Sequence, residues 1–209
     1  MYKRCIKRLI DFVMSTIAIV VLALPMLVVA LIIKIDSPGP ALFKQRRVGL
    51  HKKEFLMLKF RSMPIDAPKN VATHQLDISK IKMTAFQKAI RKYSIDELPQ
   101  LFNVWTGKLS LVGPRPALYN QYDLVEERDK YGANDVKPGI TGWAQINGRD
   151  ELEVPVKARL DGEYVERLSF LFDCKCAFGT VISVLRHDGV VEGGTGEMRR
   201  CRWKEHTKR

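Results

Sequence analysis

The stretch from Phe12 to Ile33 constrains this chain more than any other feature, because it runs for 22 residues without a charged side chain. It is too long for the apolar core of a signal peptide, and no small-residue cleavage site follows it. Its length is sufficient to cross a bilayer. The sequence therefore predicts that the N-terminal part of the chain lies in a membrane, and a single-pass anchor is the simplest interpretation.

Two further features favour a segment that enters and leaves the membrane by the same face. Pro25 lies within the stretch, where it removes a backbone hydrogen bond and tends to kink a helix. Cations also flank the stretch on both sides: Lys3, Arg4, Lys7 and Arg8 before it, and Lys34, Lys44, Arg46, Arg47, Lys52 and Lys53 after it. Cationic flanks stay on the cytoplasmic side. A re-entrant helix bent at Pro25 and a simple span are therefore equally favoured interpretations.

The charge balance supports the same location. The chain has 35 lysines and arginines against 23 acids, a net charge of +12. Residues 1–60 hold 11 of the basic residues and three of the acids, so most of the excess lies in or beside the apolar stretch. Such a zone is attracted to anionic lipid by about 1 kcal/mol per cation. With no nucleic-acid motif in the chain, we expect membrane lipid, and no nucleic acid, as the anionic partner.

The remaining pattern predicts a mixed α/β fold that is mostly helical, with a small β-hairpin or sheet element. A turn at Ser37–Pro40 precedes two short strands that flank a basic loop. The strands are expected at 41–43 and 54–60, a strand and turn at 138–148, and helices at 83–92, 94–104, 119–131, 156–168 and 170–185. We expect three parts: a membrane helix over 1–35, a folded domain over 36–188 and a flexible basic tail over 189–209.

The candidate chemical centre is an acidic pair, Asp96–Glu97, in the run from Ser94 to Val104. Its simplest interpretation is a capping box in which Ser94 is the N-cap and Glu97 reaches back to it. Asp96 is an alternative N-cap. In both cases the carboxylates lie at a helix N-terminus, an end that also attracts phosphate through its free N–H groups and its dipole.

Cations elsewhere in the chain give this pair a chemical interpretation. They lie mostly in turns and at strand ends: Lys59, Arg61, Arg91, Arg115 and Arg149. Arginine forks suit phosphate oxygens, and Mg²⁺ takes one or two carboxylates together with substrate phosphates. The combination favours phosphate chemistry with a divalent metal at a membrane. A basic, non-enzymatic membrane-anchored scaffold is the alternative.

A set of motifs in fixed order resembles the bacterial sugar transferases, the monotopic polyprenyl-phosphate phosphoglycosyl transferases. Each motif alone is weak, but the ordered set is specific, and the resemblance runs over about residues 3–185. They are Lys7-Arg8-x-x-Asp11, Ser37-Pro38-Gly39-Pro40, Gln45-x-Arg47-Val48-Gly49, Lys59-Phe60-Arg61-Ser62-Met63, the run Ser94 to Val104, Leu109 to Pro116, and Lys137 to Arg149. The length resembles the minimal catalytic unit of the family.

The resemblance implies a reaction. The donor is a UDP-sugar, the acceptor is undecaprenyl phosphate, and the products are UMP and a polyprenyl-diphospho-sugar, the first lipid-linked step of glycan synthesis. The family's catalytic dyad falls on Asp96 and Glu97. Asp96 is expected to form a covalent phosphosugar intermediate and to ligate Mg²⁺, and Glu97 is expected to assist it.

The resemblance also implies binding residues and a location. Arg91 is the candidate phosphate clamp, and Pro114-Arg115-Pro116 is expected to help bind the nucleotide. Lys59, Arg61 and Arg149 are expected contacts of the donor phosphates or the lipid phosphate. The family's membrane helix is re-entrant and broken at a proline that matches Pro25, with interfacial amphipathic helices beside it. We therefore expect the catalytic domain at the cytoplasmic face of the bacterial inner membrane; the sequence does not specify the sugar or the oligomeric state.

Overall fold

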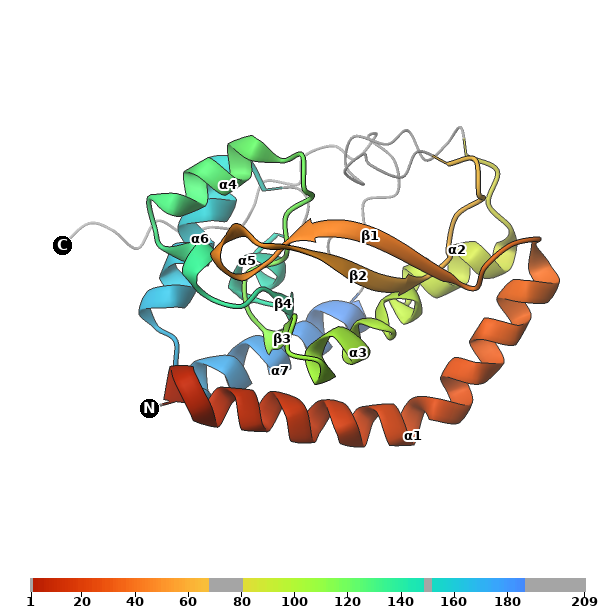
Figure 1. Ribbon diagram of the computed structural model, residues 1–209, viewed down its shortest axis with the longest axis horizontal. Helices are drawn as coiled ribbons and strands as arrows, with labels where there is room; N and C mark the ends of the chain where they lie inside the picture. The colour runs from red at the N-terminus through yellow and green to blue at the C-terminus, as the bar shows by residue number, and fades with distance from the viewer. Residues whose placement is uncertain (1, 68–80, 149–151, 187–209) are drawn as a thin grey trace.

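The computed structural model describes residues 2–67, 81–148 and 152–186, and these form a mostly helical molecule with two small sheets (Figure 1). The mixed, mostly helical fold class is thereby confirmed. The helices are α1 (Lys7–Asp36), α2 (Ala85–Lys92), α3 (Gln100–Trp105), α4 (Tyr122–Asp129), α5 (Trp143–Ile146), α6 (Val154–Glu166) and α7 (Phe170–Arg186). Shorter turns are η1 (Tyr2–Ile6), η2 (Leu50–Lys52), η5 (Ile95–Glu97) and η6 (Ala133–Asp135). The strands are β1 (Leu42–Val48), β2 (Glu54–Phe60), β3 (Ser110–Val112) and β4 (Gly139–Thr141).

Helix α1 contains the apolar stretch and is long and apolar enough to cross a membrane. Its large apolar side chains mostly face outward: Leu9, Phe12, Val13, Met14, Ile17, Val20, Val21, Leu24, Leu27, Val28, Leu31, Ile32 and Ile35. The helix bends along its length (Figure 1), and Pro25 lies inside it. Proline removes an intrahelical hydrogen bond and is the ordinary cause of such a bend. An apolar surface of this size in contact with water is unfavourable, so this face of α1 is compatible with membrane anchoring.

Both ends of α1 pack against the same folded body. Near its start, Lys7 forms a buried ion pair with Asp173 of α7 at 2.5 Å, and Asp11 accepts a hydrogen bond from the backbone N–H of Leu111 at 3.0 Å. Towards its end, the helix contributes to a buried apolar cluster of Met26, Ile33, Phe60 and Ile90. The helix therefore lies along one edge of the molecule, as Figure 1 shows, and does not extend away from it as an isolated anchor would.

The predicted hairpin is confirmed. Strands β1 and β2 pair antiparallel, with Leu42 opposite Phe60 and Val48 opposite Glu54. The prediction for the first strand was too short, because its basic residues were assigned to the loop. In the structure Lys44 and Arg46 occupy the exposed face of β1 while Gln45 and Arg47 are half-buried on the other, the alternation that a strand imposes.

The second sheet is a short parallel pair, β3 and β4, in which Ser110 lies opposite Gly139. The strand predicted within 138–148 is β4, and the short helix α5 follows it. The backbones approach so closely here that a Cβ atom on Gly113 would lie 2.5 Å from the carbonyl oxygen of Lys137. The first residue of the Pro114-Arg115-Pro116 segment is fixed at this point too, because the N–H of Gly139 donates to the carbonyl of Pro114 at 2.9 Å.

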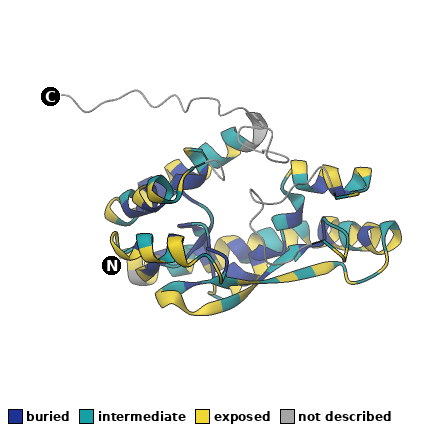
Figure 2. Ribbon diagram, turned by 90° about the horizontal axis from the view of Figure 1, so that it is seen from above, coloured by how far each residue is buried: buried dark blue, intermediate teal, exposed yellow. Residues whose placement is uncertain are grey.

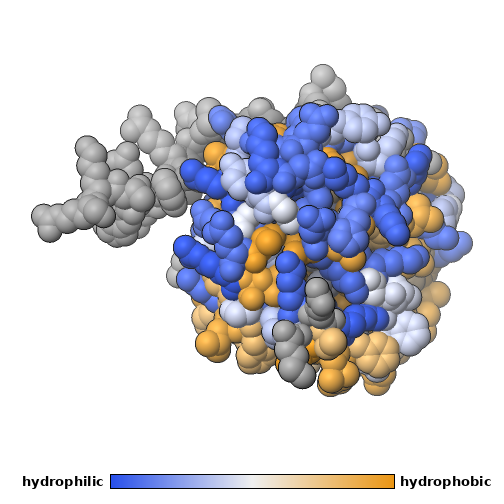
Figure 3. All heavy atoms as spheres, turned by 60° about the vertical axis from the view of Figure 1, so that its left-hand side comes forward, coloured by the Kyte–Doolittle hydropathy of each residue, from blue (hydrophilic) through white to orange (hydrophobic). Residues whose placement is uncertain are grey.

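The predicted helices at 83–92, 119–131, 156–168 and 170–185 correspond to α2, α4, α6 and α7. Buried residues gather where the helices and strands meet in the middle of the molecule (Figure 2). Apolar side chains gather in Figure 3 along the lower edge, the side on which α1 lies in Figure 1. Exposed apolar side chains also occur on α3 and α7: Phe102, Trp105, Phe170, Leu171, Phe178 and Val181. The tail expected over 189–209 lies outside the described residues, and the division of the chain at 35 and 188 stays a prediction.

Candidate active site

The acidic pair lies in a tight turn and not inside a continuous helix. The predicted helix over 94–104 is divided into the 3₁₀ turn η5 and helix α3, and Pro99 is the residue before α3. The capping box is wrong: Ser94 adopts a left-handed conformation (φ 55°) and its side chain makes no capping hydrogen bond. The alternative with Asp96 as N-cap is wrong as well, because Asp96 lies inside η5 and Pro99 is the residue that directly precedes α3.

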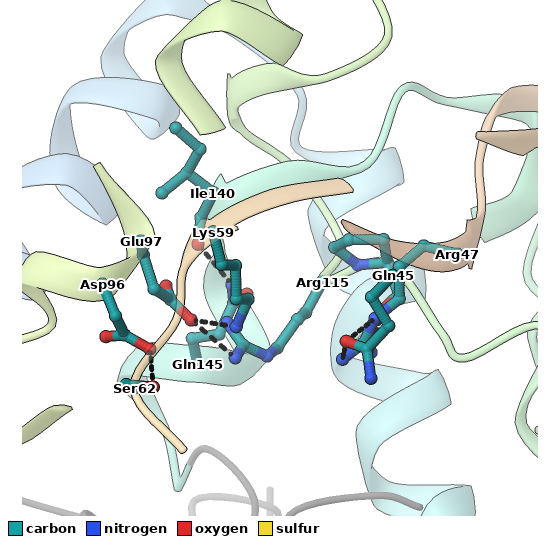
Figure 4. A network of polar contacts seen from close by, with 10 residues as sticks. Gln45, Arg47, Lys59, Ser62, Asp96, Glu97, Arg115, Ile140 and Gln145 are labelled. Carbon is teal, nitrogen blue, oxygen red and sulfur yellow. Dashed lines mark hydrogen bonds and ion pairs between the residues drawn. The ribbon is translucent and has the colours of Figure 1, made fainter. Parts of the chain in front are cut away.

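Glu97 is held between two cations. Its Oε1 atom accepts hydrogen bonds from Lys59 Nζ at 2.8 Å and from Arg115 Nη2 at 3.0 Å (Figure 4). Lys59 comes from β2 and Arg115 from the segment after β3, so the carboxylate joins both sheets to η5. Burial acts to raise the pKa of Glu97, but the charges of the two cations and their hydrogen bonds outweigh it, and the pKa is lowered. Glu97 is therefore a carboxylate at neutral pH.

Asp96 has a different environment. It is 8% exposed, and its Oδ2 atom accepts a hydrogen bond from Ser62 Oγ at 3.2 Å. Burial raises the pKa of Asp96 to about 6, and the charge of Glu97 contributes; the charges of Lys59 and Arg91 act in the opposite direction. Asp96 is thus ionised at neutral pH yet poorly solvated, which suits a carboxylate nucleophile.

The two carboxylates point in different directions, as Figure 4 shows: Asp96 towards Ser62, and Glu97 towards Lys59 and Arg115. Successive side chains on a 3₁₀ turn diverge by about 120°. This agrees with the expectation that the two acids do different work. Glu97 holds the cations Lys59 and Arg115 by hydrogen bonds, and Asp96 has no direct hydrogen bond to either of them.

The structure brings some of the predicted binding residues together. Lys59 and Arg115 meet at Glu97, and Arg91, in the last turn of α2, acts electrostatically on Asp96. The prolines on either side of Arg115 accept hydrogen bonds through their carbonyls. Pro114 accepts one from the N–H of Gly139, and Pro116 accepts one from Arg47 Nη1 at 3.0 Å. Arg149 lies outside the described residues. The roles of these residues towards substrate stay predictions.

Arg61 differs from the expectation. We expected it to contact a phosphate, but its guanidinium donates to the carbonyl oxygens of Ile33, Ser37 and Pro38, at the end of α1 and in the following turn. The side chain is 6% exposed. Its direct hydrogen bonds therefore serve the end of the membrane helix.

Several positioning contacts were not assigned from the sequence. Arg128 and Asp161 form a buried ion pair of 2.5 Å between α4 and α6, and Arg128 Nη2 also donates to the carbonyl of Arg115 at 2.9 Å. Both helices carry several charged residues, so the sequence does not indicate which of them form this pair.

Asn103 is a second such contact. Its Nδ2 donates to the carbonyl of Leu56 and its Oδ1 accepts from the N–H of Leu58, both at 2.9 Å. The amide thus pairs with β2 in the manner of a neighbouring strand. It fixes α3, which follows the acidic pair, against the strand that carries Lys59. No spacing rule in the sequence signals this contact.

At the acidic pair, the protein could supply only some of the ligands of a Mg²⁺ ion, and substrate or water would supply the rest. Among the described residues, no group of three or more His, Cys, Asp and Glu side chains could enclose a metal ion. Mg²⁺ commonly uses one or two carboxylates and takes its other ligands from substrate phosphates and water. Asp96, whose carboxylate has one described hydrogen bond on Oδ2, fits that requirement.

The fold and the site together define a membrane-associated protein whose acidic pair is surrounded by cations suited to phosphate. The chain belongs to the bacterial sugar transferase family, whose family model matches residues 2–187. The resemblance found in the motifs is therefore confirmed, and the chain is an enzyme of the sugar-transferase class.

Three relatives illustrate the range of the family. The "Uncharacterized sugar transferase EpsL" of Bacillus subtilis (strain 168) is 40% identical over 185 residues, which is 88% of this chain and 90% of that protein. The "UDP-glucose:undecaprenyl-phosphate glucose-1-phosphate transferase" of Escherichia coli (strain K12) is 40% identical over 186 residues, which is 85% of this chain. A protein of the same name from Xanthomonas campestris pv. campestris is 39% identical over 186 residues. The chain spans 40% and 38% of the lengths of the latter two.

Proposed function

We propose that this chain transfers a phosphosugar from a UDP-sugar to undecaprenyl phosphate, releasing UMP and leaving a polyprenyl-diphospho-sugar. The observation that carries the proposal is the environment of Asp96: a buried carboxylate with a raised pKa beside cations held by a second carboxylate. The family assignment and the printed activities of the Escherichia coli and Xanthomonas relatives support the substrate classes.

The reaction has two displacements. An oxygen of Asp96 attacks the phosphorus that carries the sugar, the bond from that phosphorus to the UMP oxygen breaks, and an aspartyl phosphosugar forms. An oxygen of the lipid phosphate then attacks the same phosphorus and releases the Asp96 carboxylate. A covalent intermediate divides one difficult transfer into two easier ones, and burial keeps the attacking carboxylate poorly hydrated.

Charge neutralisation is the second requirement, because an anion must approach a diphosphate. Lys59 and Arg115 are held ready by Glu97, and Arg91 lies on the side of Asp96. Arginine and lysine bind phosphate oxygens through charge-assisted hydrogen bonds. We assign Glu97 the work of orienting these cations towards the donor. Asp96 and the substrate phosphates would hold Mg²⁺, which when bound neutralises phosphate charge.

We also propose that α1 is a re-entrant helix and that the folded body lies on the cytoplasmic face of the inner membrane, as a monotopic protein. Both ends of α1 dock on the same body, and both flanks of its apolar stretch are cationic. The exposed apolar residues of α3 and α7 are suited to the interface beside α1. This arrangement exposes the site both to a soluble nucleotide and to a lipid phosphate.

The test is a UMP-release assay. Protein in membranes is incubated with undecaprenyl phosphate, Mg²⁺ and a panel of UDP-sugars. We expect lipid-dependent UMP release from at least one donor, and loss of release in Asp96→Asn while the variant stays in the membrane. No transfer from any donor, or full activity in Asp96→Asn, would contradict the proposal; the first result would favour a non-enzymatic membrane scaffold.

A further inference from the structure

Arg61 joins the end of the membrane helix to the strand beside the acidic pair. Its Nη1 donates to the carbonyl of Pro38 at 2.5 Å. Its Nη2 donates to the carbonyl and the hydroxyl of Ser37 at 2.7 and 2.8 Å, and to the carbonyl of Ile33 at 3.3 Å. The last carbonyls of a helix lack partners within the helix, and a cation there also interacts favourably with the helix dipole.

The residues on either side of Arg61 extend this connection in two directions. Phe60 packs in the apolar cluster that contains Met26 and Ile33 of α1. Ser62 donates its hydroxyl hydrogen bond to Asp96. Three consecutive residues therefore contact, in turn, the side of the membrane helix, its end, and the proposed nucleophile.

Helix α2 provides a second connection from the same point. The hydroxyl of Thr84, the N-cap of α2, donates to Asp36 at 2.9 Å. Gln87 Nε2 lies 3.5 Å from the Ser37 hydroxyl. The other end of α2 carries Arg91, whose charge acts on Asp96. The end of α1 is thus bonded to two segments that both continue to the acidic pair.

A direct phosphate contact by Arg61 is disfavoured by this arrangement. Both terminal nitrogens are engaged by acceptors at the end of α1, and the Nε atom is buried with no partner among the described residues. A phosphate that binds Nη2 would displace these oxygen atoms, which would leave buried acceptors unsatisfied.

We propose that Arg61 is a positioning residue that couples docking of the membrane helix to the placement of Asp96. It fixes the end of β2 against the end of α1, and this holds Ser62 in hydrogen-bonding reach of the carboxylate. The role rests on the proposed function, in which Asp96 is the nucleophile. It predicts that loosening the end of α1 lowers turnover without weakening donor binding.

The first experiment compares Arg61→Gln and Arg61→Lys in full-length protein in lipid nanodiscs. Displacement of a catalytic group by about 1 Å can cost up to about 100-fold in rate. We therefore expect Arg61→Gln to lower kcat by about 10-fold or more, with donor KM within about twofold of wild type. Lysine, which can still donate to carbonyls, should retain more activity than glutamine. Arg46→Gln is the matched control, since it removes an exposed arginine of the same hairpin, and it should behave as wild type.

A double-mutant cycle with Ser62→Ala identifies the route. If Arg61 acts through Ser62, Arg61→Gln should cost much less in the Ser62→Ala background than in wild type. Equal losses in both backgrounds would overturn this route. A rise in donor KM of about 10-fold or more with kcat retained would also overturn the proposal, because it is the signature of a lost donor contact.

Hydrogen–deuterium exchange tests the coupling without requiring activity. In Arg61→Gln, we expect faster exchange at residues 33–41 and also at residues 95–98, compared with wild type and Arg46→Gln. Faster exchange at 33–41 alone would show that the end of α1 and the acidic pair are independent, and would overturn the coupling. Failure of the proposed function is a separate result, because it would appear as absence of UMP release in the wild-type protein.

Discussion

At the scale of single residues, Asp96 and Glu97 show how neighbours in a chain acquire different chemistry. Both are surrounded by protein, but Glu97 is neutralised by direct ion pairs with Lys59 and Arg115, whereas Asp96 receives one hydrogen bond from Ser62. The two cations lower the pKa of Glu97, whereas burial, together with the charge of Glu97, raises the pKa of Asp96. The proposed division of labour, with Glu97 as cation holder and Asp96 as nucleophile, rests on this difference in environment.

The raised pKa of Asp96 predicts the pH dependence of the reaction. A carboxyl group with a pKa of about 6 is mostly protonated below that pH and cannot attack phosphorus. We expect kcat/KM to fall about 10-fold per pH unit below this value, and to be level above it until another group titrates. Ser62→Ala removes a hydrogen bond that lowers the pKa of Asp96, so the acidic limb should move to higher pH.

The measurement is a pH profile of UMP release with saturating lipid acceptor. A conservative change away from the acidic pair, Arg46→Gln, serves as the control and should leave the limb in place. A profile that stays level down to pH 4, or a limb that moves to lower pH in Ser62→Ala, would contradict the assignment of the acidic limb to Asp96.

At the scale of secondary-structure elements, Asn103 is the contact that we expect to be most costly to lose. It is 3% exposed, and its amide satisfies the N–H of Leu58 and the carbonyl of Leu56. Asn103→Leu keeps the size of the side chain but leaves both backbone groups unpaired. Each unpaired buried group costs about 1–3 kcal/mol, so we expect the loss of both partners to lower the free energy of unfolding by about 2–6 kcal/mol.

Denaturant unfolding of the body in detergent, followed by tryptophan fluorescence, checks this value. Asn147→Leu is the matched control, because Asn147 is exposed and, within the described part of the chain, its side chain donates to the carbonyl of Trp143 at 2.7 Å. It should change stability by less than about 0.5 kcal/mol. A loss in Asn103→Leu no larger than in the control would show that the amide does not hold α3 against β2.

Elements with a clear local pattern could be predicted from the sequence, and elements defined by long-range contacts could not. The hairpin, α2, α6 and α7 follow from strand or helix periodicity. The division of the run 94–104 could not be anticipated, because Ser94 and Glu97 have the spacing of a capping box. In the structure Glu97 instead forms ion pairs with Lys59 and Arg115, which come from distant segments of the chain. Arg61 illustrates the same limit: its residue type suits phosphate, and only the packing of α1 reveals its partners.

At the scale of the whole molecule, the relation between α1 and the body bears on the proposed membrane topology. The ion pair of Lys7 with Asp173 and the hydrogen bonds of Arg61 hold opposite ends of a 30-residue helix on one folded unit. A helix that spans the bilayer would place its ends about 30 Å or more apart across the membrane. Attachment of both ends to one body, with the bend at a proline, favours a helix that enters and returns.

This arrangement predicts the accessibility of both flanks. Single cysteines introduced at the exposed positions Lys3 and Lys53, in a background without the native cysteines, should both react with a membrane-impermeant thiol reagent in inside-out vesicles. Neither should react in intact spheroplasts. Reaction of the two positions from opposite sides would contradict the re-entrant topology and support a spanning helix.

The proposed mechanism as a whole depends on a covalent bond to Asp96, and intact-mass analysis measures that bond directly. Enzyme trapped with a competent UDP-sugar in the absence of lipid acceptor should gain the mass of one phosphosugar, peptide mapping should place it on Asp96, and undecaprenyl phosphate should remove it. Asp96→Asn should gain nothing. A competent donor that gives rapid transfer to lipid without any adduct on Asp96 would contradict the two-step mechanism.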